Sequence, residues 1–267
     1  MLITLNTGLS TLPNFTFTVG GTTYSFDPSS SSSAVNNVYY FYRDGNNWEF
    51  YAKTNGTITF RGACKVDLFM LGNGLSGAAG GYNLQSLWDT STSRYLYWAS
   101  SSYGGSGGKG GTRKTTRNVV MSGSKSVTIG STTSFGSYNS NDAGYSQANA
   151  GGNGGYVFDD STANGIDGTN YLVGAGGGNG GHTMTDGTAQ GTDTTAPGSG
   201  GTRGGGSGGS SGSSSAGNGS NASYYGSGGG GGGGWGNSNR TYSESGHGGN
   251  GNGGSGKAGF AAMRNAR

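Results

Sequence analysis

Residues 104–111 read Gly-Gly-Ser-Gly-Gly-Lys-Gly-Gly, a repeat of two glycines and one larger residue. A period of three residues is that of the polyproline II conformation, which rises about 3.1 Å per residue and has no hydrogen bonds within the chain. Every N–H and C=O group of such a segment must bond to a neighbouring segment. Two segments can approach that closely only where the facing positions carry no Cβ. The repeat therefore predicts segments packed side by side.

Similar glycine-rich runs occur elsewhere in the chain, at about 72–81, 150–155, 174–181, 198–212, 226–236 and 246–259. Only six of the 63 glycines lie in residues 1–70, so the composition changes sharply just after Leu71. This change predicts two domains, residues 1–70 and residues 71–267. Glycine loses much backbone entropy on folding, which many runs packed together can offset and one run cannot.

The first 70 residues have the pattern of β-strands. Aromatic and β-branched residues alternate between turns rich in Asp, Asn and Gly, at 15–19, 38–43, 48–52 and 57–60. Cys64 lies in the next alternating stretch and is interpreted as a small buried hydrophobic residue.

The predicted fold is mostly β and irregular. We expect a small N-terminal β-domain, the base or attachment domain, followed by a bundle of glycine-rich polyglycine II helices with long end loops. In such a bundle Gly107 and Gly251 have no room for a side chain.

The composition excludes several classes of protein. One cysteine rules out a disulfide-stapled domain, and three prolines rule out collagen. The formal charge of +3 is too small to predict a nucleic-acid partner. No stretch approaches the ~20 apolar residues of a membrane helix, and the N-terminus lacks a secretion signal, so no membrane insertion is expected.

Catalytic and metal-binding patterns are not apparent either. His182 and His247 lie in glycine-rich segments without a readable nucleophile arrangement, so we expect no enzyme and no cofactor. Residues 160–165 partly match the opening of a calcium-binding loop, but its twelfth position is Tyr171 instead of Glu. A plain loop without metal is favoured.

From residue 58 onward, several motifs follow in a definite order. Residues 58–72 (ITFRGACKVDLFMLG) run into glycine, residues 118–130 (NVVMSGSKSVTIG) and 133–136 (TSFG) follow, and residues 253–264 (GGSGKAGFAAMR) close the series. This order resembles the glycine-rich domain of bacteriophage tail-fibre and minor tail proteins, and is similar to polyglycine II adhesins at fibre tips. Residues 122–124 depart from it, because Ser-Gly-Ser stands where proline and glycine are usual.

The resemblance implies a non-catalytic bacteriophage receptor-binding protein, a tail-fibre or tail-tip adhesin that attaches the virion to the host cell surface. Such a protein is made in the host cytoplasm and resides in the virion tail or fibre. Its expected partners are a host-surface receptor, protein or glycan, and other tail or fibre proteins that bind residues 1–70. A structural decoration or fibre-capping protein without receptor activity is the main alternative. An ice-binding protein is a further one, although long aromatic insertions argue against the flat face it needs.

Aromatic residues in the insertions between glycine runs are the candidate receptor contacts, since rings on rigidly held loops supply contact area at low entropic cost. If successive runs alternate in direction, the insertions at 82–103, 156–173 and 213–225 share the end distal to the base. The insertions at 112–149, 182–197 and 237–245 then lie at the opposite end. We predict that receptor binding involves Tyr82, Trp88, Tyr95, Tyr97, Trp98, Tyr103, Tyr156, Phe158, Tyr171, Tyr224 and Tyr225.

Overall fold

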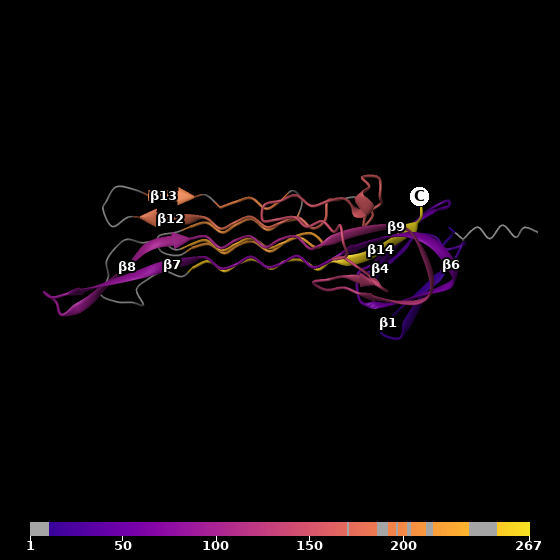
Figure 1. The fold of residues 1–267 in the computed structure, drawn as a ribbon, viewed down its shortest axis with the longest axis horizontal. Helices are drawn as coiled ribbons and strands as arrows, with labels where there is room; N and C mark the ends of the chain where they lie inside the picture. The colour runs from indigo at the N-terminus through magenta and orange to yellow at the C-terminus, as the bar shows by residue number, and fades with distance from the viewer. Residues whose placement is uncertain are drawn as a thin grey trace, which may run out of the picture.

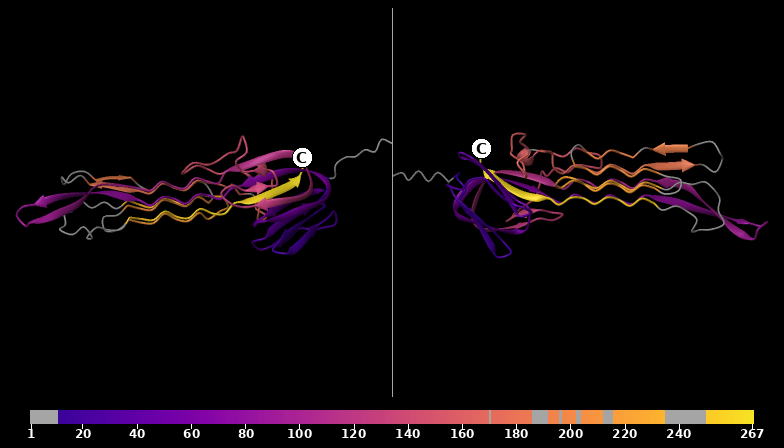
Figure 2. Two further views of the ribbon diagram at one scale, coloured as in Figure 1. Left: turned by 60° about the horizontal axis from the view of Figure 1, so that its bottom comes forward. Right: turned by 180° about the vertical axis from the view of Figure 1, so that it is seen from behind.

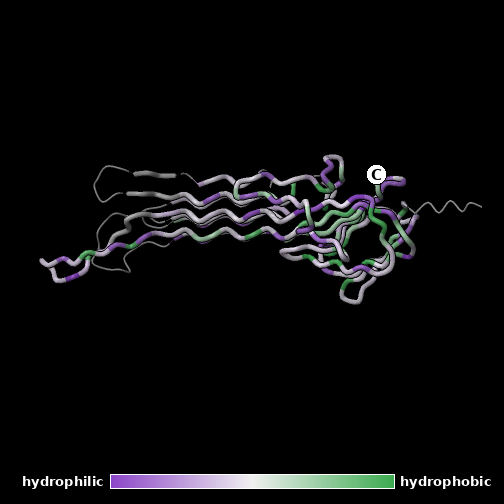
Figure 3. The backbone as a smooth tube through the Cα atoms, in the orientation of Figure 1, coloured by the Kyte–Doolittle hydropathy of each residue, from purple (hydrophilic) through white to green (hydrophobic). Residues whose placement is uncertain are grey.

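The computed structural model describes residues 11–169, 171–185, 192–195, 197–201, 204–211, 216–234 and 250–267. A β-sheet base lies at one end of an elongated molecule, extended glycine-rich segments run along its length, and hairpins lie at the other end (Figures 1 and 2). Hydrophobic residues are concentrated in the base, whereas the segments are close to neutral in hydropathy (Figure 3). The base and the segments therefore depend on different interactions.

Within the described residues, ten strands form the antiparallel sheet of the base. They are β1 (Phe15–Val19), β2 (Thr22–Phe26), β3 (Ser33–Val35), β4 (Tyr39–Asp44), β5 (Asn47–Ala52), β6 (Gly56–Leu71), β9 (Arg113–Thr128), β10 (Ser134–Phe135), β11 (Tyr138–Asn139) and β14 (Phe260–Asn265). Their order is β11-β10-β9-β6-β14-β5-β4-β3, with β1 on β6 and β2 on β1. The C-terminal strand β14 thus lies between two strands from the first 71 residues.

Side chains of the sheet alternate between two apolar clusters, as the period of a strand requires. In β6, Leu68 and Met70 face the cluster formed with the rings of β1, β2, β4 and β5, and Phe69 and Leu71 face the second cluster. All four are fully buried. Cys64 is buried in the first cluster, which confirms its interpretation as a core residue.

Glycine-rich segments cross the space between the base and the far end as extended chains. Segments 72–80, 173–181, 205–211 and 226–234 lead away from the base, and segments 104–111, 198–201, 217–223 and 250–259 lead back. Their backbone N–H groups donate to carbonyl oxygens of neighbouring segments. The donors that bond to any one neighbour are mainly three residues apart. Lateral hydrogen bonds thus satisfy the backbone along the length of the molecule.

Residues 226–234, the central segment, lie among six neighbours: 72–80, 104–111, 173–181, 205–211, 217–223 and 250–259. Successive N–H groups donate to three of them in turn. Gly228 bonds to Ala175 (N···O 2.8 Å), Gly229 to Leu75 (3.0 Å) and Gly230 to Ser220 (2.9 Å), and the next three glycines repeat the order. The other three neighbours donate to carbonyls of the central segment, through Gly206, Gly108 and Gly254.

The prediction of a β-domain followed by a bundle of helices was wrong. The described residues form a mostly antiparallel β fold without an α-helix, and η1 (Val157–Asp159) is a single 3-10 turn. Residues after 71 supply four strands of the base sheet. Two insertions expected as loops are hairpins, β7 (Gly81–Asp89) with β8 (Arg94–Tyr103) and β12 (His182–Thr185) with β13 (Thr192–Thr195). Their aromatic and β-branched residues favour strand pairing.

The close approach of the segments predicts a large effect of a single methyl group. A Cβ at Gly107 would lie 1.9 Å from the carbonyl oxygen of Gly177, whereas one at Gly62 has no heavy atom within 4 Å. Gly107→Ala should lower the free energy of unfolding by about 3 kcal/mol or more, because two backbones must separate. Gly62→Ala, the control, should change it by less than about 1 kcal/mol. Urea unfolding measures both, and equal effects would contradict the packing described here.

Candidate binding site

The residues predicted to bind a receptor lie at two ends of the molecule. Tyr82, Trp88, Tyr95, Tyr97, Trp98 and Tyr103 belong to the β7–β8 hairpin at the far end. Tyr156, Phe158, Tyr171, Tyr224 and Tyr225 lie near the base, as the ring and core contacts described below show. The predicted grouping at a single distal end was therefore wrong for the insertions at 156–173 and 213–225.

The grouping failed because the glycine runs do not all cross the molecule. The run at 150–155 turns back at the base: the Gly152 N–H donates to the Asn149 carbonyl, and Gly155 pairs with Val173. The run at 198–212 holds two segments of opposite direction. Consequently β12–β13, from the insertion at 182–197, lies at the far end, while the insertion at 112–149 supplies β9, β10 and β11 of the base. Residues 237–245 are outside the described part of the chain.

The aromatic residues near the base mainly form its core. Phe158 is fully buried, with its ring 5.9 Å from that of Phe69 and with the Arg264 guanidinium 4.5 Å from its centre. Edge-to-face contacts lead from Tyr171 to Tyr224, from Tyr224 to Tyr225 and from Tyr225 to Phe260. These rings connect the loop after η1 and the turn before the central segment to β14. Tyr156 is more exposed.

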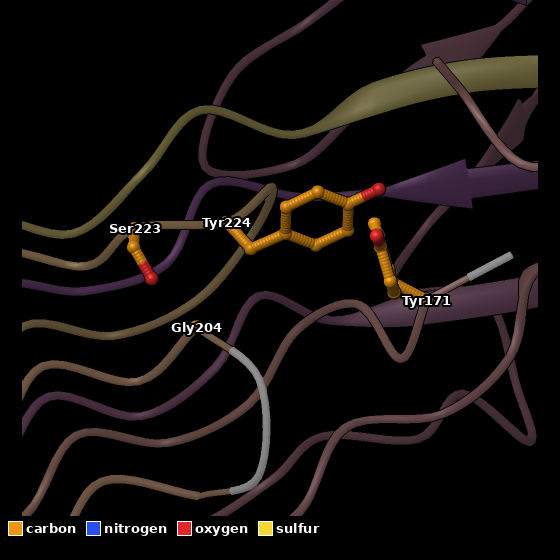
Figure 4. A pocket seen from close by; sticks show the side chains of 4 residues that line it. All are labelled: Tyr171, Gly204, Ser223 and Tyr224. Atoms are coloured by element: carbon orange, nitrogen blue, oxygen red, sulfur yellow. The ribbon is translucent and has the colours of Figure 1, made fainter. Parts of the chain in front are cut away.

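A pocket of about 290 Å³ opens beside these rings (Figure 4). Tyr171, Gly204, Ser223 and Tyr224 line it, and the two tyrosine rings lie edge to face with centroids 5.2 Å apart. Gly204 has φ +124°, and a Cβ there would lie 2.5 Å from the Cβ of Tyr224. Glycine is therefore required for the wall of this pocket.

Buried charges hold the loop after η1 against the sheet. Arg264, with a side chain 2% exposed, donates to Asp160 (2.6 Å) and contacts the buried Asp67 (3.5 Å). Burial opposes ionisation of Asp160, but hydrogen bonds from Arg264 and Thr162 outweigh it and hold the pKa of that carboxyl far below its usual range. Asp160, considered above as part of a calcium loop, thus serves as an ion-pair partner. The described residues contain no cluster of three or more potential metal ligands.

A second contact between loop and sheet uses Glu49 and Tyr51 of β5. The Tyr51 hydroxyl donates to the Glu49 carboxylate, which also accepts the Asn164 N–H (2.8 Å). The Gly165 N–H donates to the Tyr51 oxygen (3.0 Å). Burial and the adjacent carboxylate raise the pKa of Tyr51 well above its ordinary value, so this hydroxyl stays protonated and remains a donor.

Removal of the central guanidinium should destabilise the base. In Arg264→Met the buried Asp67 carboxylate keeps Arg117 (3.2 Å) and the Asn118 N–H (2.9 Å) but loses its buried cation, and Asp160 loses its 2.6 Å partner. This should lower the free energy of unfolding by about 3 kcal/mol. Arg94→Met, at an exposed position of the far hairpin, should change it by about 0.5 kcal/mol or less. Denaturant unfolding followed by tryptophan fluorescence compares the two. Similar values would show that the charge contacts contribute little.

The β7–β8 hairpin carries the clearest exposed aromatic surface. Trp88 is paired with Tyr95 across the two strands, and their ring centroids lie 5.0 Å apart with planes inclined by 70°. Tyr97 follows at 6.1 Å from Tyr95. Trp88 is 48% exposed and Tyr95 49%. Trp98 pairs with Gln85 in the register, and its side chain is outside the described part of the structure.

The turn of this hairpin is fixed by one carboxylate. Asp89 accepts hydrogen bonds from the Ser91 N–H (2.9 Å) and from the hydroxyls of Ser91 (2.7 Å) and Thr92 (2.9 Å). Four of the eight exposed large hydrophobic side chains among the described residues belong to this hairpin: Leu87, Trp88, Tyr95 and Tyr103. Such a concentration of exposed apolar surface is typical of a binding site.

The sequence matches no protein-family model, and searches of curated proteins and of solved structures find no similar protein. Among the described residues no helix is long and apolar enough to cross a membrane. His182 lies in β12, where side chains are not described, and His247 is outside the described residues.

Proposed function

We propose that this protein is a bacteriophage receptor-binding protein, a tail-fibre or tail-tip adhesin that attaches the virion to the host cell surface by binding and without catalysis. The main support is the exposed aromatic surface of β7–β8, at the end of the molecule opposite the base sheet. The order of sequence motifs described above, which resembles that of phage tail-fibre domains, points the same way.

The middle of the molecule suits this role because it is a stiff spacer. Lateral backbone hydrogen bonds join the central segment to neighbours on every side. Bending the molecule would break several of these bonds together. An adhesin needs such a spacer to present its contact residues away from its attachment point.

The base suits attachment to other tail or fibre proteins. Its core contains closely packed aromatic rings. For example, the ring centroid of Phe15 lies 4.9 Å from that of Phe26 and 5.3 Å from that of Phe50. A rigid domain of this kind can transmit force between virion and cell. Residues 1–70 are the proposed partner surface, in a virion assembled in the host cytoplasm.

Substitution at the far hairpin should reduce adsorption without unfolding the protein. Trp88→Ala and Tyr95→Ala should each weaken binding of labelled protein to a susceptible strain at least tenfold, since aromatic residues at an interface centre carry about 2 kcal/mol or more. Their melting temperatures should stay near that of the wild type, because about half of each side chain is already exposed. Flow cytometry across a panel of bacterial strains measures adsorption.

Tyr224→Ala is the matched control from the base. Its ring packs against Tyr171 and Tyr225, so this variant should melt at a lower temperature and still adsorb below that temperature. Failure of the wild-type protein to adsorb to any strain would favour a decoration or fibre-capping role. Adsorption lost in Tyr156→Ala and kept in Trp88→Ala would place the contact at the base.

A further inference from the structure

One face of the β7–β8 hairpin presents a continuous set of side chains, which we name the aromatic face. Trp88 pairs with Tyr95, Ser86 with Tyr97, and Leu84 with Ala99. Directly opposed residues of an antiparallel pair share a face, and every second residue along each strand returns to it. The aromatic face therefore contains Leu84, Ser86, Trp88, Tyr95 and Tyr97. Leu87 and Leu96, which pair with one another, belong to the opposite face.

The aromatic face carries no ionisable charge at neutral pH. Its polar groups are the indole N–H, two phenol hydroxyls and the Ser86 hydroxyl. The charged residues of the hairpin, Asp89 and Arg94, pair with each other beside the turn and have opposite sign. A phosphate or an acidic ligand would meet no cation on this face. The chemistry favours a neutral ligand that combines apolar surface with hydroxyl groups.

The size of the aromatic face favours a small ligand unit. Five residues of strand span about 14 Å, and two strands are about 10 Å wide, so the face covers on the order of 150 Å². A stable protein–protein interface buries roughly 800 Å² on each partner. The hairpin face is too narrow to supply that area, whereas a few sugar rings fit within it.

The geometry of the rings also suits a sugar. Trp88 and Tyr95 meet edge to face with their planes inclined by 70°, so the two rings present aromatic surface in two different orientations. A pyranose has C–H groups on its faces and hydroxyls at its edge. It can pack one face on an aromatic ring while its hydroxyls bond to a phenol or to the indole N–H.

We infer that the aromatic face of β7–β8 binds neutral sugar units of a cell-surface polysaccharide. This inference rests on the proposed function and names the chemistry of the receptor.

Whole cells of an adsorbing strain provide the first test. Periodate cleaves vicinal diols of sugars, and proteinase K removes surface proteins, so each treatment destroys one class of receptor. Adsorption of the full-length protein should fall at least tenfold after periodate and stay unchanged after proteinase K. The reverse result would overturn the carbohydrate inference while leaving an adhesin that binds a protein. No adsorption to any untreated strain would overturn the proposed function itself.

The second test uses polysaccharide purified from the same strain. It should compete with cells for the wild-type protein, and its affinity should fall at least tenfold in Trp88→Ala and in Tyr95→Ala. Leu87→Ala is the matched control, because Leu87 is 52% exposed on the opposite face of the same hairpin, and it should bind like the wild type. Equal losses in all three variants would overturn the assignment to the aromatic face.

Salt dependence tests whether the ligand is neutral. Affinity for the purified polysaccharide should change less than about twofold between roughly 0.05 and 0.5 M NaCl, because no ion pair is screened. A tenfold or larger decrease would show that charged groups bind the ligand, and would overturn this part of the inference.

Discussion

The architecture depends on backbones that approach one another without side chains between them. A Cβ at any residue from Gly228 to Gly234 would lie between 1.9 and 2.5 Å from a carbonyl oxygen of another segment. The central segment has neighbours on every side, so each of these positions is glycine. Segment 104–111 lies at the periphery, and there every third residue, Ser106 and Lys109, is exposed. The change from unbroken glycine to a two-in-three repeat thus follows from the number of sides on which a segment is covered.

The base sheet supplies what glycine cannot, a fixed register. Segments of repeated glycine could slide along one another by three residues and make equivalent hydrogen bonds. Strand β6 continues directly into segment 72–80, and segment 250–259 continues into β14, which pairs with β6 from Phe260 opposite Leu71. Because side chains of these strands alternate between two clusters, a slip would expose buried residues. The point where segment 250–259 continues into β14 is also stabilised by the Gly259 N–H, which donates to the Asn73 side chain (2.9 Å).

Local patterns in the sequence were sufficient for the strands of the base and for the need for glycine, but not for topology. The alternation at 15–19 and 48–52 corresponds to β1 and β5. The predicted helix-bundle class was wrong. The predicted path of the chain was also wrong, because glycine runs that cross the molecule and runs that turn back have the same appearance in sequence. A local turn at Asn149–Gly152 reverses one of these runs. Rings such as Phe158 were mistaken for surface contacts, since a ring beside glycine has the same appearance in sequence whether buried or exposed. Asp67 and Arg264 had a usable signal: Arg264 is the only charged residue of β14, and Asp67 is the only acidic residue of β6.

The position of β14 has a consequence for biosynthesis. It separates β5 from β6 in the finished sheet, although about 190 residues lie between Leu71 and Phe260 in the chain. The central segment also comes late, at 226–234. While the ribosome is still translating the earlier residues, the nascent chain has neither the strand that completes its sheet nor the segment around which the others pack. Until then its outer segments lack the hydrogen bonds that they make to the central segment. The sheet can therefore be completed only after β14 has been synthesised, and termination of translation before Phe260 leaves a product without the strand that joins β5 to β6.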